Sequence, residues 1–532
     1  MKTNTYKTCR PACFLQILVS VCCLIFMIVC FVAQSSANQI DFEYDPAFNA
    51  DNNVASADDM RTDEPVEPQK IVLIQSQEDM SNDWNKSNFW SPKTTPNTLD
   101  VSEKDGIFIV GGGFRVRSNK DAQIQTFGGD NSDKVSLYIG FENDAETPSV
   151  EKGILHIKGA VQNDDTVTIK NLVIGNGEIF QGAANANVAL NGNLTIVDNC
   201  LLRIKAEATT KTEERSLIVN SHIYGKGNLV IQSEDEKANH VSLMNMASEN
   251  NAFTGSVTIA ENTLVTLSGK DAFCNASTFT NNGVLTLAAD QTLNNLSGSG
   301  TIDVKQYKLT IHNDQNSLIS GSIDGEGDLA KTGDGTLQII TSAEGAVRAE
   351  SFVISSGRLD MEGYFEGTLK VTNDAVVIED ATIFSPGVGV GTIDIDGDMI
   401  LADGAVLLME IGGTTFAFND QLLLNGQVQF EEGAIVQFAL AADTTYTPED
   451  GDQIAVKMPK VNWDTTTFSS DDFSLDYYDD AAGLQYVKAE ANNPTKRIPA
   501  KGPTAAAVPE PSTWALLILG VAGLYFIRKK KA

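Results

Sequence analysis

Between residues 101 and 487 the sequence is built from short runs in which apolar and polar residues alternate. Residues 136–139, 194–197, 256–259 and 284–287 are examples, and glycine, asparagine and aspartate separate the runs. Alternation with a period of two is typical of strands that bury one face. A mixed α/β fold needs amphipathic helices of roughly ten or more residues, and this region contains no such pattern. We therefore predict an all-β fold.

A degenerate motif, Gly-x-Gly-x-Leu/Ile, recurs within this region. Its copies begin at Gly175, Gly225, Gly298, Gly325, Gly333 and Gly389. A nucleotide-binding glycine loop is excluded, because no helix is predicted after the motif and the third glycine is absent. We interpret the glycines as tight corners with positive φ between strands. The Leu or Ile that follows each second glycine is predicted to point into the core.

Repeats of this kind indicate stacked coils, in which each coil shares its apolar core with the next. With roughly 20–25 residues per coil and about 4.8 Å between coils, a β-solenoid accommodates residues 101–440. The uneven distances between the motif copies leave a second architecture open, namely tandem antiparallel β-sandwiches with similar strand spacing.

Two segments, 225–259 and 325–359, carry a longer pattern in which the glycine motif leads to further strands. They resemble the autotransporter-associated β-strand repeat, the building block of right-handed parallel β-helices in bacterial passenger domains. Residues 384–422 are similar to the C-terminal part of such passengers. The resemblance extends over 225–440 and implies a right-handed parallel β-helix.

The charge of the chain restricts its partners. Aspartate and glutamate number 70 against 38 lysines and arginines, which gives a formal net charge of −32. A nucleic acid would be repelled by this charge, so we exclude nucleic-acid partners.

The N-terminal residues 1–37 are predicted to form a signal peptide. A basic stretch that ends at Arg10 precedes an apolar run, and the small residues Ser35 and Ala37 suit cleavage by signal peptidase between Ala37 and Asn38. A retained N-terminal anchor is the alternative interpretation. Five of the seven cysteines lie in this segment, and the remaining pair, Cys200 and Cys274, is compatible with one disulfide or with two buried small residues.

The C-terminal end combines Pro509-Glu510-Pro511, an apolar run over 514–527 and the basic cluster 528–531. The apolar run has 14 residues, fewer than the roughly 20 that span a bilayer comfortably. This order resembles the PEP-CTERM sorting signal of Gram-negative bacteria. The resemblance implies a short apolar helix, transient insertion in the inner membrane, and cleavage by an exosortase-like transpeptidase that recognises Pro509, Glu510 and Pro511. A plain tail anchor is the alternative.

These observations divide the chain into six parts. We predict a signal peptide (1–37), an acidic flexible lead with a cap for the first coil (38–100), solenoid repeats (101–440), a C-terminal β region (441–490), a linker (491–507) and a sorting segment (508–532). Trp84 and Trp90 are the candidates for the cap, since a solenoid end must hide its apolar face.

The sequence contains no assembled catalytic set. Asp164-Asp165 and Arg203-Ile204-Lys205 are similar to parts of polygalacturonases, but His222 follows these segments, whereas that family places a Gly-His-Gly segment between them. Solvated coil positions are the competing interpretation of these residues.

No metal or cofactor site is predicted with the usual ligand spacing. The four histidines, at positions 156, 222, 240 and 312, are scattered. Asp394, Asp396 and Asp398 alternate as in a calcium loop, but the glutamate expected at the twelfth position is missing. Weak Ca²⁺ binding and a solvated acidic face both remain open.

We therefore expect a non-enzymatic, exported protein that is sorted to the cell surface or extracellular matrix, where it has a structural or adhesive role. The alternative is a carbohydrate-active β-helix, a polysaccharide hydrolase or lyase, or a carbohydrate-binding protein without turnover, acting on extracellular polysaccharide.

Overall fold

The computed structural model describes residues 67–77, 83–102, 104–158, 165–182, 187–205, 215–234, 242–247, 252–341, 345–373, 381–442, 444–449, 452–459, 467–470, 473–479 and 485–491. The chain divides into two compact units, Met1–Glu67 and Pro68–Ala532. Apart from Glu67, the described residues belong to the second unit, and the architecture below is that of this unit.

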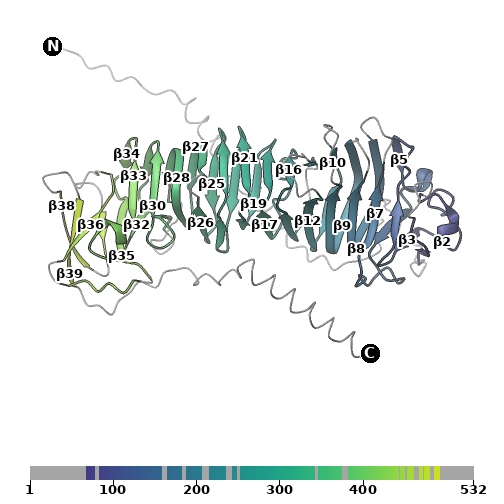
Figure 1. Cartoon of the computed structure of the whole chain (residues 1–532), viewed down its shortest axis with the longest axis horizontal. Helices are drawn as coiled ribbons and strands as arrows, with labels where there is room; N and C mark the ends of the chain where they lie inside the picture. Colours follow the sequence, from purple (N-terminus) through teal and green to yellow (C-terminus); the bar gives the residue numbers. More distant parts are fainter. Residues whose placement is uncertain are drawn as a thin grey trace, which may run out of the picture. The chain divides into compact units, whose positions relative to one another are not determined.

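The described residues are all-β and contain no α-helix, which confirms the predicted fold class at this level. Thirty-six strands form one large, open and mostly parallel sheet, and three further strands form a small antiparallel sheet. In Figure 1 the strands of the large sheet succeed one another in chain order, from β2 and β3 to β34 and β35. Parallel pairing excludes tandem antiparallel β-sandwiches for this sheet.

The first third of the sheet contains β1 (Gln69–Leu73), β2 (Trp90–Ser91), β3 (Gly106–Val110), β4 (Arg115–Arg117), β5 (Ile124–Thr126), β6 (Val135–Ile139), β7 (Gly153–Ile157), β8 (Asp165–Gln181), β9 (Asn187–Ile204), β10 (Arg215–Val219), β11 (His222–Gly225), β12 (Asn228–Ser233) and β13 (Ser242–Met246). The middle contains β14 (Ala252–Phe253), β15 (Ser256–Ile259), β16 (Leu264–Leu267), β17 (Thr278–Asn281), β18 (Val284–Leu287), β19 (Gln291–Asn294), β20 (Leu296–Ser297), β21 (Thr301–Lys305), β22 (Leu309–His312), β23 (Ser317–Ile319), β24 (Ser322–Gly325), β25 (Leu329–Thr332) and β26 (Thr336–Ile340). The remaining strands are β27 (Val347–Ile354), β28 (Arg358–Val371), β29 (Ile383–Pro386), β30 (Thr392–Asp396), β31 (Met399–Leu401), β32 (Val406–Ile411), β33 (Gln421–Leu424), β34 (Val428–Phe430), β35 (Ile435–Leu440), β36 (Gln453–Val456), β37 (Thr467–Ser469), β38 (Phe473–Asp479) and β39 (Gln485–Ala491). Among the described residues there are also three short 3₁₀ helices, η1 (Ser87–Phe89), η2 (Gly129–Asn131) and η4 (Phe416–Phe418).

Three ladders of parallel strands run through the C-terminal half of the sheet. In each ladder a strand pairs with the one that follows it after one round of the chain through all three ladders, and such a round is called a coil here. The first ladder joins β18, β21, β24, β27, β28, β30 and β33. The second joins β19, β22, β25, β27, β28, β31 and β34. The third joins β23, β26, β28, β29, β32, β35 and β37. The chain visits the three ladders in turn before it returns to the first.

Alternation of side chains explains why these runs pair as strands. In β18 and β21 every second side chain is buried, and their inward residues belong to one continuous core cluster with members from Ile71 to Met458. Paired residues in the middle of the sheet, such as Thr301 and Ser322 or Leu309 and Leu329, are 20 or 21 residues apart. The buried residues of successive paired strands therefore lie in one continuous core.

The glycine motif forms corners, as the sequence predicts. Five of the six first glycines have positive φ, and Gly175 is the exception. All six following Leu or Ile residues are at most 1% exposed: Ile179, Leu229, Ile302, Leu329, Leu337 and Ile393. A Cβ on Gly225 would overlap the carbonyl oxygen of Ile196, one coil earlier, so the corner needs a glycine for close approach as well as for its φ.

At the N-terminal end the sheet begins at β1, inside the segment predicted as the acidic lead. The apolar run within β1 pairs with β3 in parallel and with β2 in antiparallel fashion. Trp84 and Trp90 are buried there, the Trp90 indole N–H donates to the carbonyl of Trp84, and edge-to-face contacts join the two rings to Phe127 and Phe108. Strands β1 and β2 thus lie before residue 101, at which the solenoid repeats are predicted to begin.

At the other end, the predicted β region 441–490 contains two kinds of strand. β37 continues the third parallel ladder by pairing with β35. β39 pairs with β36 and β38 in the separate antiparallel sheet. The described part of the chain holds no helix with the length and apolar character needed to cross a membrane. The predicted signal peptide with Ala37 and Asn38, the linker beyond residue 491 and the sorting segment with Pro509, Glu510 and Pro511 lie outside the described residues.

Candidate functional site

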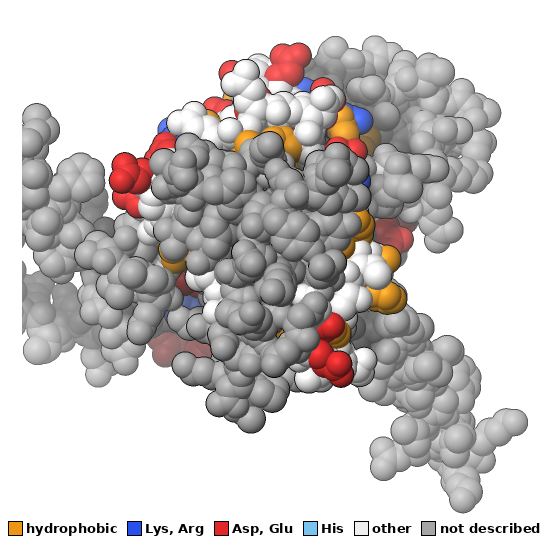
Figure 2. All heavy atoms as spheres, turned by 90° about the vertical axis from the view of Figure 1, so that its left-hand side faces the viewer, with side chains coloured by type: hydrophobic (Ala, Val, Ile, Leu, Met, Phe, Trp, Pro, Cys, Tyr) orange, Lys and Arg blue, Asp and Glu red, His pale blue; other side chains and the backbone are white. Residues whose placement is uncertain are grey.

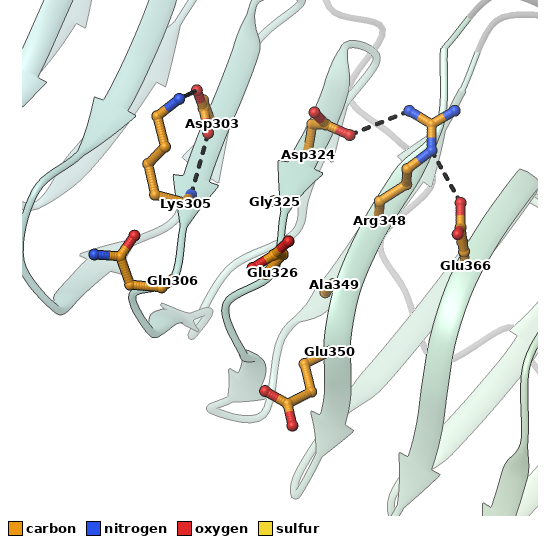
Figure 3. A pocket seen from close by; sticks show the side chains of 10 residues that line it. All are labelled: Asp303, Lys305, Gln306, Asp324, Gly325, Glu326, Arg348, Ala349, Glu350 and Glu366. Atoms are coloured by element: carbon orange, nitrogen blue, oxygen red, sulfur yellow. Dashed lines mark hydrogen bonds and ion pairs between the residues drawn. The ribbon is translucent and has the colours of Figure 1, made fainter.

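An open hollow of about 790 Å³ lies over four neighbouring strands of the first ladder, β21, β24, β27 and β28. We call it the charged groove (Figure 3). Its lining consists of Asp303, Lys305, Gln306, Asp324, Gly325, Glu326, Arg348, Ala349, Glu350 and Glu366. Seven of these ten residues carry a charge, five of them acidic, so the groove has an excess of negative charge.

Register places the charged side chains in a row. Asp303 pairs with Asp324, and Arg348 pairs with Glu366. Equivalent residues of a parallel sheet lie about 4.8 Å apart and point to the same side. The row continues with Asp396, which is the partner of Glu366 on β30.

The hollow exists because the chain turns a corner there with residues that have little or no side chain. Gly325, with φ of 143°, pairs with Lys305, and Ala349 lies on the next strand. A Cβ on Gly367 would overlap the carbonyl oxygen of Ala349, and one on Gly397 would overlap that of Gly367. Successive corners are therefore held in backbone contact, and side chains project only from the strands on either side.

Ion pairs organise the groove. The Arg348 guanidinium contacts Asp324 and Glu366, each at 3.1 Å, and Lys305 contacts Asp303 at 2.5 Å (Figure 3). The hydrogen bond to Asp324 raises the pKa of Arg348, and the hydrogen bond to Asp303 raises the pKa of Lys305. These pairs are about half exposed, so they orient the side chains more than they stabilise the fold.

The groove offers carboxylate acceptors, two cationic donor groups and no described aromatic platform among its lining residues. Such a surface suits a polar, uncharged or cationic chain that runs across successive strands. Figure 2 views the molecule from its C-terminal coils, and acidic side chains are also prominent among the described residues on that face.

The acidic triplet that resembles a calcium loop lies at the end of the same row. Asp396 accepts hydrogen bonds from Asn425 Nδ2 at 3.1 Å and from the Tyr364 hydroxyl at 3.3 Å, and Asp398 accepts from the backbone N–H of Gln427 at 2.8 Å. Within the described residues, no group of three or more His, Cys, Asp or Glu side chains is arranged to hold a metal ion. Weak calcium binding at this triplet stays a prediction.

The residues that resemble a polygalacturonase site are not gathered in one place. Asp164 lies outside the described residues, and Asp165 is buried at the start of β8, where it pairs with Val188. Arg203 pairs with Phe180, and His222 pairs with Asn193. Each pair lies on a different side of the coil.

Arg203 has a structural environment instead. Its Nε donates to Glu178 at 2.9 Å, its Nη1 contacts Glu234, and its guanidinium lies 4.2 Å from the centre of the Phe180 ring. Among the other histidines, His312 contacts Thr332 at 3.0 Å through Nδ1, His156 is buried, and His240 lies outside the described residues.

Cys200 and Cys274 are free thiols in the structure, so they do not form the disulfide that the sequence left open. Cys200 lies in β9, and Cys274 precedes β17, which is three parallel pairings further on through β12 and β15. Three steps of about 4.8 Å exceed the roughly 7 Å between Cα atoms that a disulfide permits. Burial raises the pKa of both thiols.

Sequence reasoning missed the charged groove. The residues of its row are separated by unequal numbers of residues along the chain, so their alignment depends on the register of each strand pair. These residues are Asp303, Asp324, Arg348 and Glu366. One sequence signal could have indicated the groove. The glycine motif at Gly325 predicts a corner with small residues, and such a corner leaves a hollow between the side chains on either side.

Comparison with known proteins identifies one segment. Residues 507–531 match the family of the PEP-CTERM protein-sorting motif. The motif implies an exported protein that is processed by an exosortase, a sorting transpeptidase, and sorted to the cell surface or extracellular space. No curated protein and no solved structure matches the chain.

Proposed function

We propose that this protein is a non-enzymatic β-solenoid with a structural or adhesive role at the cell surface or in the extracellular matrix. The match of residues 507–531 to the PEP-CTERM sorting motif is the observation that carries the proposal, because it provides the route to that location. The large parallel sheet supports the structural part, since in a solenoid each coil stabilises the next through shared strand pairing and core.

The solenoid is proposed to be a right-handed parallel β-helix. Three observations support this architecture: parallel pairing about one coil apart, three ladders visited in turn, and one continuous core. Right-handed connections are strongly favoured between parallel strands of one sheet. Of the two segments that resemble autotransporter-associated repeats, 325–359 lies within these ladders, and 225–259 lies in earlier parallel strands of the same sheet.

Processing of the tail tests the sorting route. Mass spectrometry of the C-terminal peptide of the native protein should show that residues 514–532 are absent from surface material, because the exosortase cuts near Pro509-Glu510-Pro511. Replacing these three residues with alanine should leave the full chain in the inner membrane. An intact Arg528–Lys531 end on surface material, or normal release of the alanine variant, contradicts this route.

The charged groove favours a second candidate, binding of an extracellular polysaccharide without turnover. The row of Asp303, Asp324, Arg348 and Glu366 presents hydrogen-bonding groups at a spacing close to the length of one sugar ring. Carboxylates and a guanidinium are the groups that commonly bond to sugar hydroxyls.

Incubating the purified protein with a panel of neutral and amino-sugar polysaccharides separates the candidates. Glycan binding predicts saturable retention that falls at least tenfold in Asp324→Asn/Glu366→Gln, while the matched variant Asp121→Asn, a surface acid far from the groove in sequence and register, retains it. A purely structural role predicts no saturable binding. Release of reducing sugar that Asp165→Asn abolishes would instead establish the polysaccharide-cleaving alternative and contradict a non-enzymatic role.

A further inference from the structure

The loop 412–420, which joins β32 to β33, connects the last coils of the large sheet with the small antiparallel sheet. Two hydrogen bonds attach this loop to β36. The N–H of Ala455 donates to the carbonyl of Thr414 at 3.1 Å, and Asn419 Nδ2 donates to the carbonyl of Ala455 at 2.8 Å. Asn419 is 1% exposed, so the contact is closed to water at this side chain. We call this contact the junction.

The carboxyl group of Asp420 fixes the end of the loop. One oxygen accepts a hydrogen bond from the N–H of Gly391 at 2.9 Å, and the other accepts from the N–H of Glu410, near the end of β32, at 2.6 Å. Gly391 lies one coil earlier, since its carbonyl accepts from the N–H of Gln421. Asp420 is 0% exposed. One buried carboxyl group therefore connects the loop, the strand before it and the preceding coil.

Further charged groups lie around Asp420. They come from β28, from β32 and from the residue that bridges to β33, and they are Arg358, Asp360, Glu362, Glu410 and Lys457. The Arg358 guanidinium contacts Asp360 and also Glu410, the latter at 3.2 Å. Asp360 and Glu410 are buried, whereas Lys457 is exposed. The ionisation of Asp420 thus adds a further negative charge next to a buried ion-pair cluster.

Burial decides the protonation of Asp420, because a carboxylate loses its hydration when it is removed from water. Burial is the largest effect on its pKa, and the charge of Glu410 acts in the same direction. The two backbone N–H donors and Arg358 act against them, and the pKa of Asp420 remains well above 3.8. The carboxyl group is therefore neutral in the folded chain at pH values at which an exposed aspartate is ionised.

We propose that the junction is a pH-operated clasp, which is closed while the Asp420 carboxyl group carries a proton and opens when this group ionises. Ionisation places a negative charge beside Glu410 in a site without access to water, and opening of the loop 412–420 restores its hydration. Opening also separates Thr414 and Asn419 from β36, so the antiparallel sheet loses these hydrogen bonds to the last coils. The clasp is independent of the sorting route and of the charged groove.

The direction of the pH dependence follows from proton linkage. The closed junction binds the proton of Asp420 more tightly than the open junction, in which the carboxyl group has its ordinary pKa. The closed junction is therefore most stable below the ordinary pKa of an aspartate, and it loses stability as the pH rises toward the raised pKa. In this interval the equilibrium constant for opening should increase about tenfold for each pH unit.

Hydrogen exchange of the full chain, followed by mass spectrometry between pH 5 and pH 8 and corrected for the intrinsic exchange rate, measures this opening. Peptides that contain Gly391 or Glu410, whose N–H groups donate to Asp420, should lose at least tenfold in protection over this range. A peptide from β21 and β22 should keep its protection. Constant protection of the junction peptides from pH 5 to pH 8 overturns the proposal.

Two variants identify the responsible group. Asp420→Asn is neutral at every pH, so protection of the junction peptides should no longer change with pH. Asp394→Asn, which removes an exposed carboxylate from the neighbouring β30, should retain the pH dependence of the unmodified chain. In the unmodified chain, the carboxyl ¹³C resonance of Asp420 should titrate over the pH range in which protection is lost. An unchanged pH dependence in Asp420→Asn, or an Asp420 resonance that is already that of a carboxylate at pH 5, overturns the proposal.

Discussion

Lys331 shows how far the environment of one residue can depart from what its type suggests. It is fully buried in β25, and its ammonium donates to the carbonyl oxygens of Thr332, Gly333 and Ser356 at 3.2, 2.6 and 3.0 Å. Ser356 belongs to the next coil, so the ammonium ties two coils together. Gly357 has a φ of 68°, and a Cβ there would overlap the carbonyl oxygens of Gly333 and Gly335, which explains why a glycine occupies this corner.

The pKa of Lys331 gives a prediction for the pH dependence of stability. Burial lowers this pKa from 10.5 to about 8. Between these pH values the unfolded chain binds a proton that the folded chain has released, so stability rises with pH in this window. From pH 7 to pH 9 the free energy of unfolding should therefore increase by about 1.4 kcal/mol more in the unmodified protein than in Lys331→Met.

Urea unfolding at the two pH values measures this difference, and Lys308→Met, which removes an exposed lysine, is the control. The control should follow the unmodified protein. An equal difference between the unmodified protein and Lys331→Met at both pH values would show that Lys331 does not lose its proton near pH 8.

The same residue illustrates what the sequence can and cannot predict about side chains. Alternation places Leu329 and Lys331 on the same inward side of β25, yet a lysine beside Thr-Gly-Asp-Gly is typical of a solvated turn. The Leu and Ile after each Gly-x-Gly are apolar, so pattern and residue type agree there and burial was predicted correctly. Where the two signals conflict, as at Lys331, burial depends on the carbonyl groups that the folded corner supplies, and one of these, that of Ser356, comes from the next coil.

Two strands are longer than the sequence predicts, because pairing continues through breaks in the alternation. Only short runs were expected, but β8 and β9 have 17 and 18 residues. Register shifts between Ile169 and Asn171 and between Ile174 and Asn176 let β8 bend around the coil without leaving the ladder. A bulge of this kind keeps pairing where the sequence shows only a break in the alternation.

Pairing partners were harder to predict than strands. Alternation indicates that a strand buries one face, but it does not distinguish parallel from antiparallel neighbours, so β36, β38 and β39 could not be separated from the large sheet. Asparagines at regular intervals give a better signal of which strands pair. Asn220 Nδ2 donates to Asn191 Oδ1 at 3.1 Å, and Asn228 Nδ2 donates to Asn199 Oδ1 at 3.0 Å. Both pairs are 29 residues apart, which is the coil length at that point.

The stack as a whole should tolerate the loss of one complete coil. Residues 301–321 comprise β21, β22 and β23, and their removal joins Gly300 to Ser322. Gly321 occupies the position in its coil that Gly300 has one coil earlier, since a Cβ on Gly321 would overlap the Gly300 carbonyl. After the deletion β18, β19 and β20 can pair with β24, β25 and β26 in the existing register.

We expect this deletion variant to keep its β circular dichroism and a cooperative urea transition. A matched deletion of 301–311 removes β21 and most of β22 but keeps β23, so the strands on either side of the junction cannot pair in the existing register and the cooperative transition should be lost. Equal loss of structure in both variants would contradict an architecture of interchangeable coils.

The short distance along the chain between paired strands has a consequence for how this protein reaches its native state. Partners such as Leu309 and Leu329 are 20 residues apart in a chain of 532, so every coil closes through a small loop. Each described strand of the middle region pairs with strands that are close to it in the sequence, so its partners are made shortly before or after it. A chain that emerges from an export channel N-terminus first can thus add one coil at a time onto the first strands around Trp84 and Trp90. Folding then proceeds in the direction of secretion, with only the latest coil exposing its apolar face.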